Sequence, residues 1–267
     1  MFRACAIPLF LSFALLAVAA EPQILTNTGE AMRVAYTCPD DDMQFAGMYC
    51  SESEPCAIYL ELSAVAASAR KILISGNLHS SSATLYSVLL SSDDAGATWK
   101  EPVARIRGSA IDQLQVLDAQ HAWAAGETQY PLARDPFFLV TTDGGFSWRQ
   151  RPVSDDGGPG SVQVFSFDNA QHGELVIDAG NTSSSGRYVS YESQTGGESW
   201  TMRSTTQQLP RIKTPAADTS WRLEPAKDEK SWQLEKRDGN QWTPAAAFLI
   251  EVAKCSGEAD AAPGKAQ

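Results

Sequence analysis

The stretch Thr141–Trp148 reads TTDGGFSW, and an upstream stretch, Ser91–Trp99, reads SSDDAGATW. Aligned on their tryptophans, both place a hydroxyl residue, an Asp, a Gly and a Trp at the same offsets: Ser92, Asp94, Gly96 and Trp99, and Thr141, Asp143, Gly145 and Trp148. Neither copy contains a nucleophile–base pair or a metal-ligand spacing. The repetition therefore indicates a recurring structural turn.

Two further copies are degenerate. SQTGGESW keeps Ser193, Gly197 and Trp200, with Thr195 where the Asp belongs. EKRDGNQW keeps only Gly239 and Trp242. The intervals between the four tryptophans are 49, 52 and 42 residues. A period of this length is typical of an array of similar units, in the range of propeller blades.

Each unit is interpreted as four strands, because short apolar runs alternate with polar turns. In the second unit we expect strands at 111–118, 121–127, 137–142 and 147–153, with the motif closing the turn between the third and fourth. Asp and Ser or Thr side chains accept hydrogen bonds from turn amides. Gly permits a positive φ, and Trp covers apolar area. No long helical period is present.

The spacing S/T-x-D-x-G-x-x-W resembles the Asp-box (bacterial neuraminidase repeat) of sialidases, sortilin-type receptors and photosystem II assembly-factor propellers. The resemblance covers roughly residues 57–250 and implies an all-β fold, a β-propeller of four-stranded antiparallel blades, with structural Asp-box turns on its rim. We expect one propeller domain at 21–255 with five blades, four to six being possible. Residues 21–56 and 243–255 are expected to close the ring as a further blade, because an open array leaves edge strands exposed.

The N-terminal sequence MFRACAIPLFLSFALLAVAAEP has the layout of a signal peptide over residues 1–20. We expect an exported protein, periplasmic or extracellular, that is soluble and monomeric, with no membrane span. The polar tail 256–267 is expected to be disordered. A net charge of −11 argues against binding to nucleic acid.

Four cysteines remain beyond the leader, which favours two disulfides with three possible pairings. The short segment CSESEPC suggests Cys50–Cys56, and Cys38–Cys255 would then join the two ends of the domain. A zinc site fits less well, because CxxC spacing is absent.

Enzymatic activity is not expected. Sialidase-type propellers resemble one another in an early Arg-Ile-Pro motif, an arginine triad and a Tyr–Glu pair. Upstream of the first repeat this chain has Arg33 and Arg70, neither followed by Ile-Pro. We expect no catalytic residue, no cofactor and no metal. The acidic run Asp40–Asp42 is interpreted as a solvated loop, with a calcium site as the alternative.

The face opposite the motif turns should carry the loops between second and third strands and the connections between blades. These loops are rich in arginine, which suits recognition of carboxylates. A partner with an acidic patch is therefore expected there, and the plain alternative is that each Arg pairs with a nearby Asp or Glu. The candidate partner-binding residues are Arg105, Arg107, Tyr130, Arg134, Arg187 and Arg211.

The leading functional hypothesis is a non-catalytic, exported propeller that binds a protein partner as an envelope assembly or accessory scaffold. The TxDGGxxW turns and the HAWAAG-type second strand resemble the photosystem II assembly-factor group. Three alternatives remain open: a propeller that binds carbohydrate (a glycan), a periplasmic inhibitor of a toxic enzyme, and a glycosidase of sialidase type.

Overall fold

The computed structural model describes residues 23–129, 132–180, 186–214 and 219–256. Strands form most of this part of the chain, and α1 (Asp40–Phe45) is the one helix among the described residues. The all-β class expected from the sequence is confirmed. Within the same residues, no helix is long and apolar enough to cross a membrane.

Two of the sheets are built from four strands in sequence order, each antiparallel to the next. The second and third strands of the first of these sheets, and the second strand of the other, are buried along most of their length. The strands are β6 (Ser109–Val116), β7 (Ala122–Thr128), β8 (Arg134–Thr141) and β9 (Arg149–Pro152), then β10 (Ser161–Phe167), β11 (Gly173–Asp178), β12 (Tyr188–Ser193) and β13 (Thr201–Thr206).

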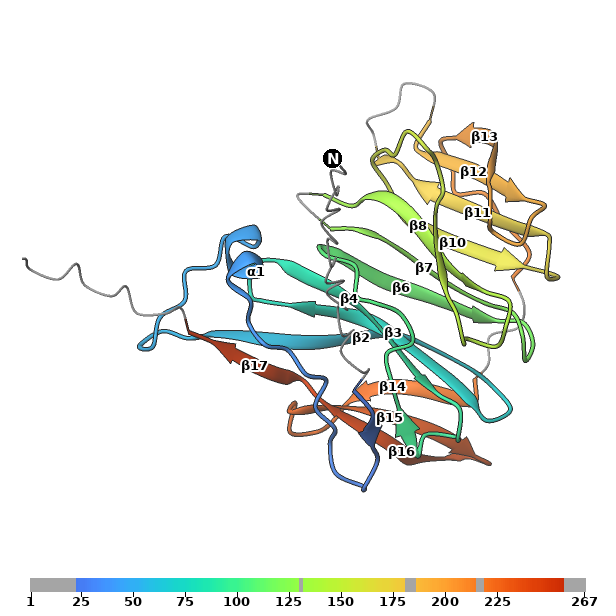
Figure 1. Ribbon diagram of the computed structural model, residues 1–267. Helices are drawn as coiled ribbons and strands as arrows, with labels where there is room; N and C mark the ends of the chain where they lie inside the picture. Colours follow the sequence, from blue (N-terminus) through green and yellow to red (C-terminus); the bar gives the residue numbers. More distant parts are fainter. Residues whose placement is uncertain (1–22, 130–131, 181–185, 215–218, 257–267) are drawn as a thin grey trace, which may run out of the picture.

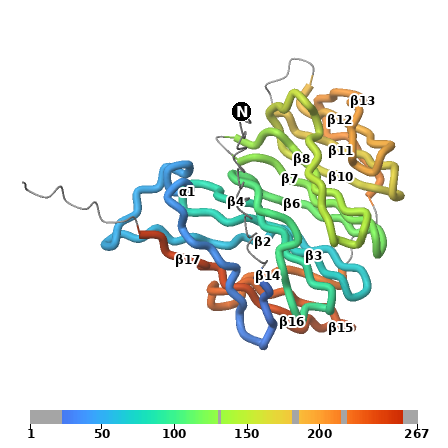
Figure 2. Tube along the Cα trace, in the orientation of Figure 1, coloured from blue at the N-terminus to red at the C-terminus, as the bar shows by residue number. Residues whose placement is uncertain are grey.

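The other two sheets receive residues from both ends of the chain (Figure 2). The C-terminal strand β17 pairs with β2, giving the order β17-β2-β3-β4, and Met32 forms a parallel bridge with Phe248 at the edge of β14-β15-β16. Their strands, with the small β1–β5 pair, are β1 (Leu25–Thr26), β2 (Cys56–Ser68), β3 (Lys71–His79), β4 (Thr84–Ser92), β5 (Thr98–Trp99), β14 (Trp221–Pro225), β15 (Ser231–Asp238), β16 (Gln241–Leu249) and β17 (Glu251–Cys255).

The sheets pack one after another as propeller-type blades (Figure 1). From bottom to top the figure shows β14–β16, then β2–β4 with β17, then β6–β9, then β10–β13. An apolar cluster fills each of the three junctions between them, around Trp99, Phe137 and Trp123 respectively. Among the described residues, no such cluster joins β10–β13 to β14–β16.

The terminal segments differ from the fifth blade that was expected. The described chain contains four large sheets, which lies inside the expected range of four to six. β17 and Met32 extend two of these sheets, and β1 pairs with β5, so the terminal strands add to existing blades. Because these segments pair with the edges of existing sheets, their backbone N–H and C=O groups are hydrogen-bonded without a further sheet.

The acidic run Asp40–Asp42 begins α1 where a solvated loop was expected; Asp40 and Asp41 are exposed, but Asp42 is not. Asp42 is 1% exposed. Its carboxylate accepts hydrogen bonds from the hydroxyls of Tyr36 (2.9 Å) and Tyr86 (2.7 Å) and from the guanidinium of Arg107. Because a buried carboxylate must be hydrogen-bonded, these three donors fix α1 against the loop before β6.

Two disulfides hold the terminal segments. Cys38 bonds Cys255, across 217 residues of sequence, and Cys50 bonds Cys56. The first links the segment before α1 to the last strand, where Cys255 lies opposite Cys56 in the β17–β2 ladder. Both pairings are those that the sequence favoured, and together they join the two ends of the domain.

Candidate functional site

The two intact copies of the S/T-x-D-x-G-x-x-W motif form nearly identical turns. The hydroxyl of Ser92 accepts from the Gly96 amide (2.8 Å), and the Asp94 carboxylate accepts from the amide (2.8 Å) and hydroxyl (2.7 Å) of Thr98. These bonds from Thr98 lower the pKa of Asp94 to about 2. Gly96 has a φ of 95°, which disfavours any residue with a side chain.

The second copy repeats these contacts, with Ser147 in the place of Thr98. Its hydroxyl and amide donate to Asp143 and lower the pKa of that carboxyl to about 2. In the third copy Thr195 replaces the Asp, and its hydroxyl accepts from the Ser199 amide (3.0 Å). The fourth copy is the turn between β15 and β16, where Gly239 has a φ of 58°. Each motif therefore serves as a turn, with its polar groups used internally.

The motif tryptophans lie at the junctions between blades. Trp99 meets Phe248 edge to face, with ring centroids 5.3 Å apart, and Trp200 packs on Phe138 of the preceding sheet (4.9 Å). Trp148 belongs to the cluster between β4 and β6–β8. Aromatic burial of this kind stabilises the packing of one blade on the next.

Antiparallel hairpins put the loops between second and third strands, and the connections between sheets, at the end of each blade opposite to the Asp-box turns. We call this end the loop face. Most of the arginines expected to bind a partner are engaged by acidic groups within the chain. Arg105 binds Glu101, and Arg107 binds Asp42.

The later arginines follow the same pattern. Arg134 contacts Asp135 (2.8 Å), and Arg187 binds Asp178. Arg211 is exposed, and no ion pair joins it to another described residue. Tyr130 lies outside the described residues. The contacts fit the alternative in which each Arg pairs with a nearby acid, and a role of these residues in partner binding stays a prediction.

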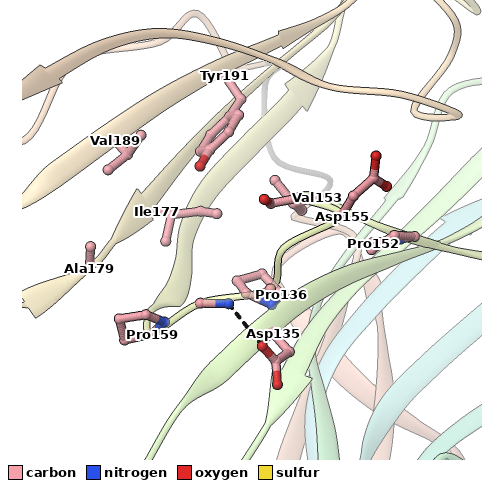
Figure 3. A pocket seen from close by; sticks show the side chains of 13 residues that line it. Asp135, Pro136, Pro152, Val153, Asp155, Pro159, Ile177, Ala179, Val189 and Tyr191 are labelled. Carbon is pink, nitrogen blue, oxygen red and sulfur yellow. Dashed lines mark hydrogen bonds between the residues drawn. The ribbon is translucent and has the colours of Figure 1, made fainter.

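A pocket of about 540 Å³ opens on the loop face between β8–β10 and β11–β12 (Figure 3). Val153 and Ile177 are buried in its wall, and Tyr191 extends over them from β12. Its lining is mainly apolar, with a few polar groups at the edge: Asp135, Pro136, Pro152, Val153, Ser154, Asp155, Gly157, Gly158, Pro159, Ile177, Ala179, Val189 and Tyr191. Apolar pockets with few polar groups are the usual form of a binding site.

The loop before β10 is held in one conformation at the pocket's edge. Asp135 exchanges backbone hydrogen bonds with this loop: its amide donates to the Gly158 carbonyl (2.8 Å), and its carboxylate accepts from the Gly158 amide (2.9 Å). Asp135 itself has a φ of 50°. Strain at such a residue persists only where surrounding contacts determine the conformation. The pocket is therefore preformed.

The contacts of Asp135 also decide whether the pocket could act as the active site of a glycosidase. A glycosidase needs one carboxyl that donates a proton and a second carboxylate across the scissile bond. Asp135 and Asp155 both line the pocket, but the Asp135 oxygens accept from Gly158 and from the Arg134 guanidinium. This arrangement makes Asp135 an anchor for the loop. Among the described residues, no group of three or more metal-ligating side chains could hold a metal ion.

Trp123 and Trp221 do not form an aromatic platform of the kind that carbohydrate binding would use. Trp123 is 0% exposed and stacks on Phe167, with ring centroids 3.8 Å apart. Its indole N–H donates to the Gly196 carbonyl of the next blade. Trp221 is half-buried, with the Lys236 ammonium over its ring. Trp123 therefore fills the core and offers no surface to a sugar.

A group of acids that the sequence analysis did not identify lies where β2, β6 and β7 meet. Glu127 is 5% exposed, and burial raises its pKa to about 7, with a contribution from the charge of Asp112. The pKa of Asp112 is raised by desolvation and by the charge of Glu61. We call Glu61, Asp112 and Glu127 the acid cluster.

β-Bulges occur in the first strands of three of the blades, and two of them lie in this region. Ser63, Asp112 and Gln163 are the extra residues of the bulges in β2, β6 and β10, at intervals of 49 and 51 residues. Gly76 and Gly126 face the first two bulges, and a Cβ there would lie 1.9 Å and 2.1 Å from a backbone carbonyl oxygen. The recurring glycines in SGN and AGE were the available sequence signal.

Neither a protein-family model nor a curated protein matches this chain. Among solved structures, it is similar to YCF48 bound to a D1 peptide, with a TM-score of 0.37 and 17% identity over 70% of this chain and 57% of that one. It is also similar to the GH74 xyloglucanase from Xanthomonas campestris, with a TM-score of 0.37 and 14% identity over 69% and 28% of the two chains. The chain thus spans less than two thirds of both, and its fold is assigned from its own sheets.

Proposed function

We propose that this chain is a non-catalytic, exported propeller that binds a protein partner through its loop face. The observation that supports the proposal best is the preformed apolar pocket between β8–β10 and β11–β12. Loops held on a rigid scaffold are the usual place for recognition. The D1 peptide is a property of YCF48 and is not transferred to this chain.

The composition of the pocket favours an extended polypeptide segment. Pro136, Pro152 and Pro159 together with Tyr191 give flat, rigid apolar walls. Rigid walls lose little conformational entropy on binding, which raises affinity. An inhibitor of a toxic enzyme would be one form of such a binder.

Export and an envelope role are part of the proposal. Two disulfides favour an oxidising compartment, and the leader-like sequence 1–20 favours secretion. Cell fractionation with mass spectrometry of the N-terminus tests this part. A chain in the envelope fraction that begins near Glu21 agrees with it, and an intact N-terminus in the cytoplasm contradicts it.

Site-specific photocrosslinking tests the binding. The photoreactive residue p-benzoylphenylalanine replaces Asp155 at the pocket's lip or, as the control, Phe146 in an Asp-box turn on the opposite face, which is 85% exposed. Envelope extract should give a discrete crosslinked protein from position 155 only. Pro152→Arg should abolish the product, while Phe146→Arg should leave it intact. Equal crosslinking from the two faces contradicts the proposal.

A further inference from the structure

The acid cluster on the loop side of β2, β6 and β7 has no positive partner. The ion pairs of the described residues engage many carboxylates, but none of them involves Glu61, Asp112 or Glu127. Glu127 instead accepts from the Val162 amide (3.3 Å) and from the side chain of Gln129 (3.1 Å). Negative charge is therefore concentrated here without compensation.

The elements hold these acids together across two blades. The bulge residue Ser63 donates to the Ile111 carbonyl (2.7 Å), which joins β2 to β6 beside Asp112. Asp112 and Glu127 lie on paired strands of the same sheet. Since like charges that lie close together repel, each disfavours ionisation of its neighbours. A bound cation would relieve this repulsion.

A polar pocket of about 400 Å³ adjoins the cluster. Glu61 and Gln129, which contact the cluster or belong to it, line this pocket together with Asn77 and His79. Asn77 is 6% exposed; its amide nitrogen donates to Glu61 (3.3 Å), while its carbonyl oxygen has no hydrogen-bond partner. An unpaired buried acceptor favours a ligand that brings a donor.

The other groups around this pocket are also mainly acceptors. The Ser80 carbonyl accepts from His79 Nδ1 (2.8 Å). The Glu61 carboxylate supplies further lone pairs. Guanidinium and ammonium groups carry only donors, and guanidinium presents five of them in one plane. Both match an acceptor-rich, negatively charged pocket.

We propose that the acid cluster and its adjoining pocket bind a basic side chain, an arginine or a lysine, of the protein partner. This inference rests on the proposed function and states the partner's chemistry. The arginine-rich loops had suggested an acidic partner, whereas the acid cluster calls for a basic one. Four of the loop arginines form ion pairs within the chain: Arg105, Arg107, Arg134 and Arg187. Arg211 is not among these pairs, and the acid cluster itself has no positive partner among the described residues.

The test uses the purified protein and a defined probe. A capped Ala-Arg-Ala-Arg-Ala peptide is titrated by NMR, beside its citrulline counterpart, which keeps the shape and lacks the charge. Glu61→Gln and Asp112→Asn, both at solvent-exposed positions, should weaken binding of the arginine peptide about tenfold each. The control variant Asp155→Asn removes one acid at the apolar pocket, and it should change the affinity for the arginine peptide less than twofold. The citrulline peptide should not bind.

Three results would overturn the inference: equal losses in all three variants, equal binding of both peptides, or no binding of the arginine peptide. Each is distinct from failure of the proposed function. If the crosslinked partner is lost with Pro152→Arg but kept with Glu61→Gln and Asp112→Asn, partner binding stands and the basic contact is refuted. If no partner is captured while the peptide responds as expected, the acid cluster stands and the proposed function is refuted.

Discussion

Replacing Glu127 by Gln should stabilise the protein at neutral and alkaline pH. Burial moves the pKa of Glu127 from 4.5 to about 7. The folded protein therefore holds this proton more tightly than the unfolded chain does, and its stability falls as the pH rises from about 4.5 to about 7. Each pKa unit corresponds to about 1.4 kcal/mol, so the ionised carboxylate costs about 3 kcal/mol above pH 7. A glutamine avoids this cost.

Urea unfolding at pH 5 and pH 8 measures the effect. At pH 8 Glu127→Gln should raise the free energy of unfolding by up to about 3 kcal/mol, and at pH 5 it should change it little. The Val162 amide can still donate to the glutamine oxygen, and Gln129 can reorient its amide. Asp112 interacts with Glu127, so the two carboxyls titrate as a coupled pair. The difference in unfolding free energy between the wild type and Glu127→Gln therefore reflects both carboxyls.

The matched control is Glu174→Gln, which removes a half-buried carboxylate from β11. This variant should keep the wild-type dependence of stability on pH. If Glu127→Gln shows the same pH dependence as the wild type, or is less stable at pH 8, the claim that Glu127 is buried without a compensating charge is refuted. A gain of equal size at both pH values would point to packing and would contradict the electrostatic explanation.

Three further predictions concern the scaffold. Replacing Cys38 and Cys255 by Ser should lower the free energy of unfolding by about 2–5 kcal/mol, because the bond closes a loop of 217 residues; a thermal midpoint equal to that of the oxidised wild type would contradict this. Asp42→Ala removes three hydrogen bonds and should cost about 3 kcal/mol by urea unfolding, whereas a loss below 1 kcal/mol would show that the burial of this carboxylate contributes little. Gly126→Ala places a Cβ 2.1 Å from a backbone carbonyl and should cost about 1–3 kcal/mol by thermal unfolding; unchanged stability would refute the close approach at the bulge.

The turns of the S/T-x-D-x-G-x-x-W motif could be predicted from the sequence because the side-chain bonds that shape them are local. Ser92, Asp94 and Thr98 satisfy one another within seven residues, so the residue types alone specify the turn. The four strands expected in the second unit appear as β6, β7, β8 and β9 within a few residues of the expected limits. Alternation of short apolar runs with turn residues was sufficient for the fold class.

The acid cluster could not be predicted in this way. Glu61 and Asp112 are brought together only when β2 packs against β6, and the burial of Glu127 depends on the next blade through Val162. Sequence shows charges but not which of them find partners. For the same reason the sequence left open whether the arginines of the loop face bind a partner or pair with nearby acids, and in the structure Asp42 and Asp178 bind two of them.

The number of blades could not be predicted from the sequence because the terminal segments carry no repeat. The turn motif marks each blade that contains it, but β1, Met32 and β17 carry no repeat, so their place could only be inferred from the need to close the ring. The pairing of the cysteines was more informative. A bond between Cys38 and Cys255 already required the two ends to meet, and the β17–β2 ladder is where they do.

The β17–β2 ladder also has a consequence for biosynthesis. The first large sheet to be synthesised is β2–β4. Its fourth strand, β17, is synthesised some 160 residues later. Until then one of its edges is unsatisfied and can recruit foreign strands. Translational pausing or truncation before β17 should therefore produce aggregates seeded by the N-terminal half, and any helper that accompanies this polypeptide during maturation would have to shield β2.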